Sequence, residues 1–69
     1  MLEGFSERLN ETILKSGISM RDLAKRLGTD HSTVRSWMVM RAQPNIRSLA
    51  KLCLILDVSA DYLIYGKER

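Results

Sequence analysis

The chain is predicted to fold as an all-α protein, a compact bundle of five short helices. Apolar residues recur at steps of three and four along most of the sequence, as on the buried face of a helix, and no stretch shows the period of two that a strand requires. Capping residues and glycines divide this pattern into five segments. With 69 residues the chain is long enough for one small core, so residues 1–69 are expected to form a single domain.

The first helix is expected to run from about Leu2 to Lys15 and to end at Gly17, because glycine readily leaves the helical conformation. Steps of three and four place four apolar residues on one face: Leu2, Phe5, Leu9 and Ile13.

The second helix is expected to follow Ser19, a good N-cap residue, with Asp22 three positions later in the capping position. The apolar pair Ile18 and Leu23 is spaced to pack across the helix start. Gly28 then ends this helix, since a glycine adopts the left-handed turn conformation at little cost.

Asp30 is the predicted N-cap of a third helix that reaches at least Met38. Pro44 cannot continue a helix, and Asn45 caps a fourth that runs to about Leu56. The expected inner face of the fourth helix consists of Ile46, Leu49, Ala50, Cys53 and Leu56.

The last helix is expected to be short, with Ser59 as its N-cap and Gly66 as its stop. Three of its residues are expected to pack back onto the bundle: Tyr62, Leu63 and Ile64.

The stretch from Met20 to Trp37 has the spacing of a helix-turn-helix, two short helices joined by a tight turn. Such a unit needs apolar contacts, a small residue where the helices cross, a glycine in the turn and two anchors in its second helix. The residues at these places are, in order, Leu23, Ala24, Leu27, Gly28, Val34 and Trp37. Polar and basic side chains of the second helix then point outward. This arrangement indicates DNA binding.

Positive charge is concentrated on the same part of the chain. Between Met20 and Lys51, seven Lys and Arg residues stand against two Asp residues, a net charge of +5, whereas the rest of the chain carries −2. A polyanionic partner such as double-stranded DNA requires this kind of field.

Several segments resemble the lambda-repressor-like, Cro-type helix-turn-helix family of phage and bacterial repressors. They are "ISMRDLAKRLGTDHSTVRSWM", the Pro44-Asn45 helix opening, "LAKLCLILDVS" and "SADYLIYG", and together they cover almost the whole chain. The resemblance implies a five-helix domain that binds operator DNA, usually as a dimer, with the third helix in the major groove.

The chain departs from the family pattern at five positions, and one of them is Thr29, which replaces the usual aliphatic residue after the turn glycine. Met20 replaces a common Gln that supports a phosphate contact. Ile13 and Met38 stand where the family often has an Arg–Glu ion pair, so packing is expected to replace that pair. Met40 replaces the glycine that commonly ends the recognition helix. A left-handed residue is costly there, so the helix is expected to end differently or to run on toward Arg41.

Residues of the third helix that face away from Val34 and Trp37 are the candidates for reading bases: His31, Ser32, Arg35 and Ser36. Arg35 suits a bidentate hydrogen-bond pair with guanine, and His31 suits an acceptor such as guanine N7. The alternative for each is an exposed side chain that contacts no base. The expected phosphate contacts are Ser19, Met20, Thr33, Arg41, Gln43, Asn45 and Arg47.

A small domain gains limited specificity alone, so a homodimer is expected on a near-palindromic operator, with half-sites roughly 34 Å apart. The candidate dimer surface consists of Leu54, Ile55, Tyr62, Ile64 and Tyr65. The alternative is that these residues belong to the core of their own chain.

Other functional classes find little support. One His and one Cys are too few for a zinc site or a nucleophile–base pair, so no metal, cofactor or enzymatic activity is expected. The longest apolar run has five residues, so no membrane span is expected, and the single Cys53 suggests the reducing cytoplasm. The remaining alternatives are a protein-interaction module on the same fold and an antitoxin-like regulator.

Overall fold

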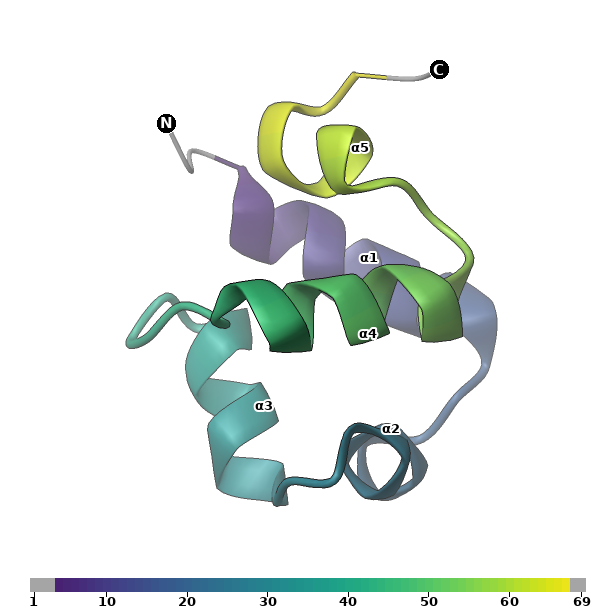
Figure 1. The fold of residues 1–69 in the computed structure, drawn as a ribbon, viewed down its shortest axis with the longest axis vertical. Coiled ribbons are helices and arrows are strands. Elements are labelled where there is room, and N and C mark those ends of the chain that lie inside the picture. The colour runs from purple at the N-terminus through teal and green to yellow at the C-terminus, as the bar shows by residue number, and fades with distance from the viewer. Residues whose placement is uncertain (1–3, 68–69) are drawn as a thin grey trace.

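The computed structural model describes residues 4–67, and within them it contains five α-helices and no strand (Figure 1). The helices are α1 (Phe5–Ser16), α2 (Met20–Leu27), α3 (His31–Met38), α4 (Ile46–Leu56) and α5 (Ala60–Tyr65). The predicted all-α fold is confirmed.

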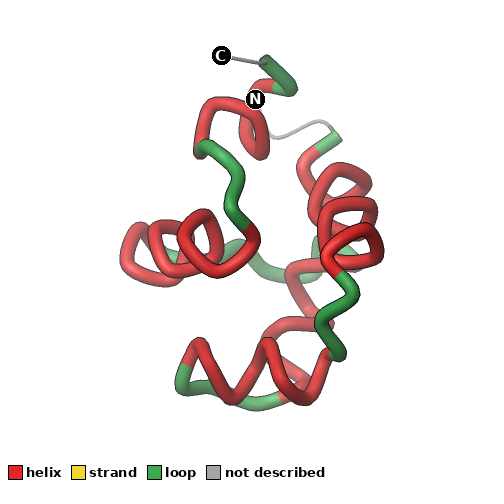
Figure 2. The backbone as a smooth tube through the Cα atoms, turned by 90° about the vertical axis from the view of Figure 1, so that its right-hand side faces the viewer, coloured by secondary structure: helices red, strands yellow, loops and turns green. Residues whose placement is uncertain are grey.

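The helices surround a single core. α1 packs against α3, α4 and α5, while α2 packs against α3 and α4. Figures 1 and 2 show α2 and α3 together at the end of the molecule opposite α5. The buried apolar side chains form one cluster, to which every helix contributes: Phe5, Leu9, Ile13, Leu23, Ala24, Leu27, Val34, Trp37, Leu52, Leu56 and Leu63.

All four predicted N-caps are confirmed. The side chains of Ser19, Asp30, Asn45 and Ser59 each accept a hydrogen bond from the backbone N–H three positions later, over 2.8–3.1 Å. Each cap satisfies one of the donors that a helix start leaves without a partner in its own helix.

The first helix begins later than expected. Its start is Phe5 and not a residue near Leu2, because Gly4 has a left-handed backbone with φ 81°, which no α-helix continues through. The expected contribution of Leu2 lies outside the described residues. The predicted apolar face is otherwise confirmed, and Thr12 is buried beside it.

The predicted inner face of α4 is partly wrong. Ile46 is 85% exposed and Ala50 is also exposed, whereas Leu52, which the prediction omitted, is completely buried. The buried face runs through Leu49, Leu52 and Leu56, at steps of three and four. A helix that turns this face inward carries Ile46 and Ala50 away from the core.

The end of α3 also differs from expectation. The helix stops at Met38, and Met40 takes the left-handed conformation that it was expected to avoid, with φ 62°. Two backbone hydrogen bonds close this turn, from Arg41 N to Ser36 O (2.8 Å) and from Met40 N to Trp37 O (3.3 Å). They satisfy carbonyls that the helix end leaves open, which offsets the strain at Met40.

Among the described residues, no helix combines the length and the apolar character that a membrane-spanning segment needs.

Candidate nucleic-acid interface

α3 is anchored by two buried side chains and turns its other face to solvent. Val34 is completely buried and Trp37 is only 4% exposed, so both fix the helix to the core. His31 and Arg35 are exposed, and their spacing of four residues places them on the same face of the helix. The structure therefore meets the geometric condition for a recognition helix, an apolar back and an accessible polar front.

The hydroxyl groups of α3 already donate hydrogen bonds, either to the Asp30 cap or within the helix. Asp30 Oδ1 accepts from Ser32 Oγ (3.2 Å), Thr33 N (3.0 Å) and Thr33 Oγ1 (2.7 Å). Ser36 Oγ donates to Thr33 O over 2.6 Å. The hydrogen bonds from the Thr33 hydroxyl and backbone, and then from Ser32, hold the pKa of Asp30 below its usual value.

The side chains of His31 and Arg35, in contrast, form no hydrogen bond or ion pair with any described residue. On the exposed face of α3 their donor groups are therefore open to a ligand. The serines remain open only as acceptors, unless a ligand breaks an existing bond.

Most basic residues near α3 also lack an acidic partner. The two ion pairs in the described part of the chain join Lys15 to Glu11 (3.2 Å) and Arg26 to Asp22 (3.3 Å). The exposed side chains without such a partner are Arg21, Lys25, Arg35, Arg41, Arg47 and Lys51. The positive charge that the sequence concentrates here is thus largely uncompensated at short range.

The expected phosphate contacts differ in what they offer. Arg41, Gln43 and Arg47 are exposed on or beside the loop between α3 and α4, which projects next to α3 in Figure 1. Ser19 and Asn45 are exposed helix caps, and the first backbone N–H groups of α2 and α4 follow them. The side chains of Met20 and Thr33 are half-buried, so Met20 offers mainly its backbone N–H group, whereas the N–H of Thr33 already donates to Asp30 Oδ1.

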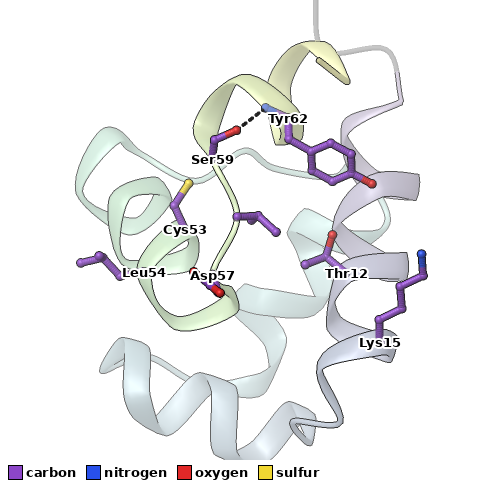
Figure 3. A pocket seen from close by; sticks show the side chains of 8 residues that line it. Thr12, Lys15, Cys53, Leu54, Asp57, Ser59 and Tyr62 are labelled. Atoms are coloured by element: carbon purple, nitrogen blue, oxygen red, sulfur yellow. Dashed lines mark hydrogen bonds between the residues drawn. The ribbon is translucent and has the colours of Figure 1, made fainter. Parts of the chain in front are cut away.

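The candidate dimer residues separate into two groups. Leu54 is 83% exposed and Tyr65 is 57% exposed, whereas Ile55 and Tyr62 pack against the core of their own chain and Ile64 is half-buried. Beside Leu54 lies an open groove between α1, the end of α4 and the start of α5 (Figure 3). Its lining residues are Thr12, Lys15, Cys53, Leu54, Asp57, Val58, Ser59 and Tyr62.

The described residues show no metal site. No group of three or more His, Cys, Asp or Glu side chains within residues 4–67 is placed to hold a metal ion. Burial raises the pKa of the Cys53 thiol, so this group is protonated at neutral pH.

The sequence interpretation missed two features close to α3. Val39, Met40 and Ile46 expose apolar side chains around the α3–α4 loop. Asn10 of α1 donates a hydrogen bond to the carbonyl of Met38 (3.1 Å). The exposure of Ile46 depends on how α4 is rotated against the core, and no sequence signal marks a contact between residues 28 positions apart.

The sequence of this chain is similar to those of known proteins. The model of the helix-turn-helix family matches residues 9–63. The SPbeta prophage-derived uncharacterized HTH-type transcriptional regulator YonR of Bacillus subtilis (strain 168) is 34% identical over 62 residues, which are 90% of this chain and 57% of that protein. The uncharacterized HTH-type transcriptional regulator YqaE of the same organism is 28% identical over 64 residues, 93% of this chain and 55% of that protein.

The chain thus spans little more than half the length of these relatives. No solved structure shows a significant match.

Proposed function

Because the chain belongs to the helix-turn-helix family, we propose that it is a transcriptional repressor that binds a near-palindromic operator as a dimer, with α3 in the major groove. One observation carries this proposal: Trp37 and Val34 hold α3 from behind, while Arg35 and His31 point to solvent without a partner. Residues 1–69 form the DNA-binding unit in this proposal.

Arg35 is the main determinant of sequence preference. Its guanidinium group matches the two acceptors of guanine, O6 and N7, and no described residue competes for its donors. His31, one turn nearer the helix start, donates to a further acceptor such as N7. Ser32 and Ser36 contribute less, because their hydroxyl protons already serve Asp30 and Thr33.

Phosphate contacts orient the domain on the duplex. Arg41, Gln43 and Arg47 lie beside the end of α3, and the N-termini of α2 and α4 offer backbone N–H groups after Ser19 and Asn45. Met20 joins them through its backbone N–H group, whereas Thr33 joins them only where a phosphate replaces Asp30 as the acceptor of its hydrogen bonds. These contacts carry no sequence information, and they make the affinity fall as salt rises.

The dimer surface lies on α4 and α5. Leu54 and Tyr65 supply its exposed apolar area, Ile64 lies at its edge, and Ile55 and Tyr62 support it from the core side. In this proposal a second copy covers the exposed apolar area that Leu54 and Tyr65 contribute.

The same exposed area favours a second candidate, a protein-interaction module or an antitoxin-like regulator that binds a protein through α4 and α5. In the pure interaction module, the basic surface around α3 plays no part in recognition.

Selection of binding sites from random duplex DNA, followed by gel retardation of Arg35→Ala, separates these candidates. We expect the wild type to select a sequence and Arg35→Ala to lose about tenfold or more of the preference for it, as expected when a bidentate base contact is removed. Arg21→Ala is the matched control, because it removes the same charge from α2 and weakens binding to all duplexes alike.

A wild type that selects no sequence, or an Arg35→Ala variant whose preference equals that of Arg21→Ala, contradicts the proposal and favours the interaction module.

A further inference from the structure

The carbonyl groups at the end of α3 accept hydrogen bonds from two kinds of donor, backbone N–H groups and a side chain. Backbone N–H groups of residues 39–42 donate to the carbonyls of residues 35–37, over 2.8–3.3 Å. The carbonyl of Met38, the last residue of the helix, instead accepts from the side chain of Asn10 on α1, with 3.1 Å between O and Nδ2. One end of α3 is therefore held by a side chain from another helix.

The amide of Asn10 is oriented by its own helix. Nδ2 also donates to the carbonyl of Ser6, one turn earlier in α1, over 2.7 Å. Both neighbours of this nitrogen are acceptors, so only the NH2 group satisfies them, and the orientation of the amide is unambiguous. One N–H is anchored in α1, and the other is thereby aimed at Met38.

This bond adds direction to a contact that is otherwise apolar. Ile13 of α1 is buried in the core, and Met38 of α3 packs against the same core. Apolar packing sets how close two helices lie, but it is non-directional, whereas a hydrogen bond also fixes an angle. The Asn10 amide thus supplies an angular constraint that apolar packing does not.

We propose that Asn10 is a positioning residue for DNA recognition. By holding the Met38 carbonyl it fixes the end of α3 against α1, and with it the angle at which Arg35 meets the base edges. This inference rests on the proposed function.

Sequence-selective binding is the quantity that this role controls. Base-edge hydrogen bonds weaken steeply when their angle changes, whereas binding to arbitrary DNA depends on the charges of exposed Lys and Arg side chains and tolerates a tilted helix. Loss of the Asn10 bond should therefore reduce selective affinity and spare general affinity.

The chain offers a matched control two positions away on α1. Arg8 donates to the carbonyls of Leu63 (3.0 Å) and Ile64 (2.8 Å), so it holds the end of α5 as Asn10 holds the end of α3. Asn10→Asp and Arg8→Gln each lower the net charge by one and each remove a bond to a helix end. Only Asn10→Asp acts on α3.

The test measures affinity for a duplex with one selected half-site and for a scrambled duplex of equal length. We expect Asn10→Asp to bind the half-site about five- to tenfold more weakly and to bind the scrambled duplex as Arg8→Gln does, with an equal salt dependence. Amide hydrogen exchange at residues 39–42 should also accelerate in Asn10→Asp and stay unchanged in Arg8→Gln.

Asn10→Ala, which adds no charge, replaces Asn10→Asp in the test if the latter does not fold. An unchanged ratio of half-site to scrambled affinity in the Asn10 variants overturns the inference, as does an equal fall of that ratio in Arg8→Gln. A wild type without any preferred half-site overturns the proposed function and this inference together, so the two failures are distinguishable.

Discussion

Met40 carries the clearest backbone strain near the candidate interface. Its φ of 62° costs a residue with a Cβ atom about 1 kcal/mol, a cost that glycine avoids. We expect Met40→Gly to raise the free energy of unfolding by up to about 1 kcal/mol, measured by urea denaturation. Val39→Gly is the matched control, because Val39 has a φ of −108° and gains nothing from glycine.

A Met40→Gly variant no more stable than Val39→Gly would show that the turn after α3 stores no strain.

Asp30 makes the stability of the start of α3 depend on pH. Hydrogen bonds from Thr33, and then from Ser32, lower its pKa in the folded protein below the usual 3.8. A lowered folded-state pKa means that the carboxylate stabilises the fold above pH 3.8, and that this contribution disappears as pH falls through the lower folded value. The stability advantage of the wild type over Asp30→Ser should therefore shrink below about pH 4.

Urea unfolding of both proteins between pH 3 and pH 6 checks this, since the titration of all other groups cancels in the difference. If the difference in unfolding free energy between the two proteins stayed constant with pH, the ionised form of Asp30 would contribute nothing as a cap.

At the scale of helices, the capping residues could be predicted from the sequence, whereas the rotation of a helix about its own axis could not. Ser19, Asp30, Asn45 and Ser59 cap as predicted, because a cap depends on a few consecutive residues. The inner face of α4 was partly mispredicted, because eight of its eleven residues are apolar or cysteine and several rotations bury a similar number of them. The packing of α4 against α1 and α2 decides among these rotations.

The buried face of α4 leads to opposite predictions for two similar residues. Leu52→Ala leaves a cavity in the core and should lower the free energy of unfolding by about 2–5 kcal/mol. Ile46→Ala removes an exposed side chain and should change it by no more than about 0.5 kcal/mol. Chemical denaturation of both variants is decisive: similar losses would mean that Ile46 is covered in solution.

The candidate site follows the same division between local and long-range information. The exposed positions of His31 and Arg35 follow from the burial of Val34 and Trp37 on a short helix, a pattern visible in the sequence. The contact between Asn10 and Met38 depends on how α1 crosses α3, which no local pattern encodes. The left-handed Met40 was missed because propensity alone omits the hydrogen bonds that close the turn.

For the whole molecule, the separation of two surfaces allows DNA contact and self-association to be tested independently. The basic surface gathers around α2, α3 and the following loop, whereas the exposed Leu54 and Tyr65 belong to α4 and α5. Loss of a contact on α4 or α5 should therefore change how two copies cooperate without changing how each copy meets its half-site.

Leu54→Ser tests this separation. Burial of an exposed leucine contributes about 1.5–3 kcal/mol, so the variant should lose roughly tenfold or more of the cooperativity on a two-half-site duplex and keep its affinity for one half-site. Leu14→Ser is the matched control, since Leu14 is 81% exposed on α1 and lies outside the proposed surface. Analytical ultracentrifugation with each duplex measures the stoichiometry. Equal cooperativity in both variants would place the dimer contact elsewhere on the molecule. A wild type that occupies the two half-sites independently would remove the dimer from the proposal, because burial of Leu54 by a second copy is what links the two half-sites.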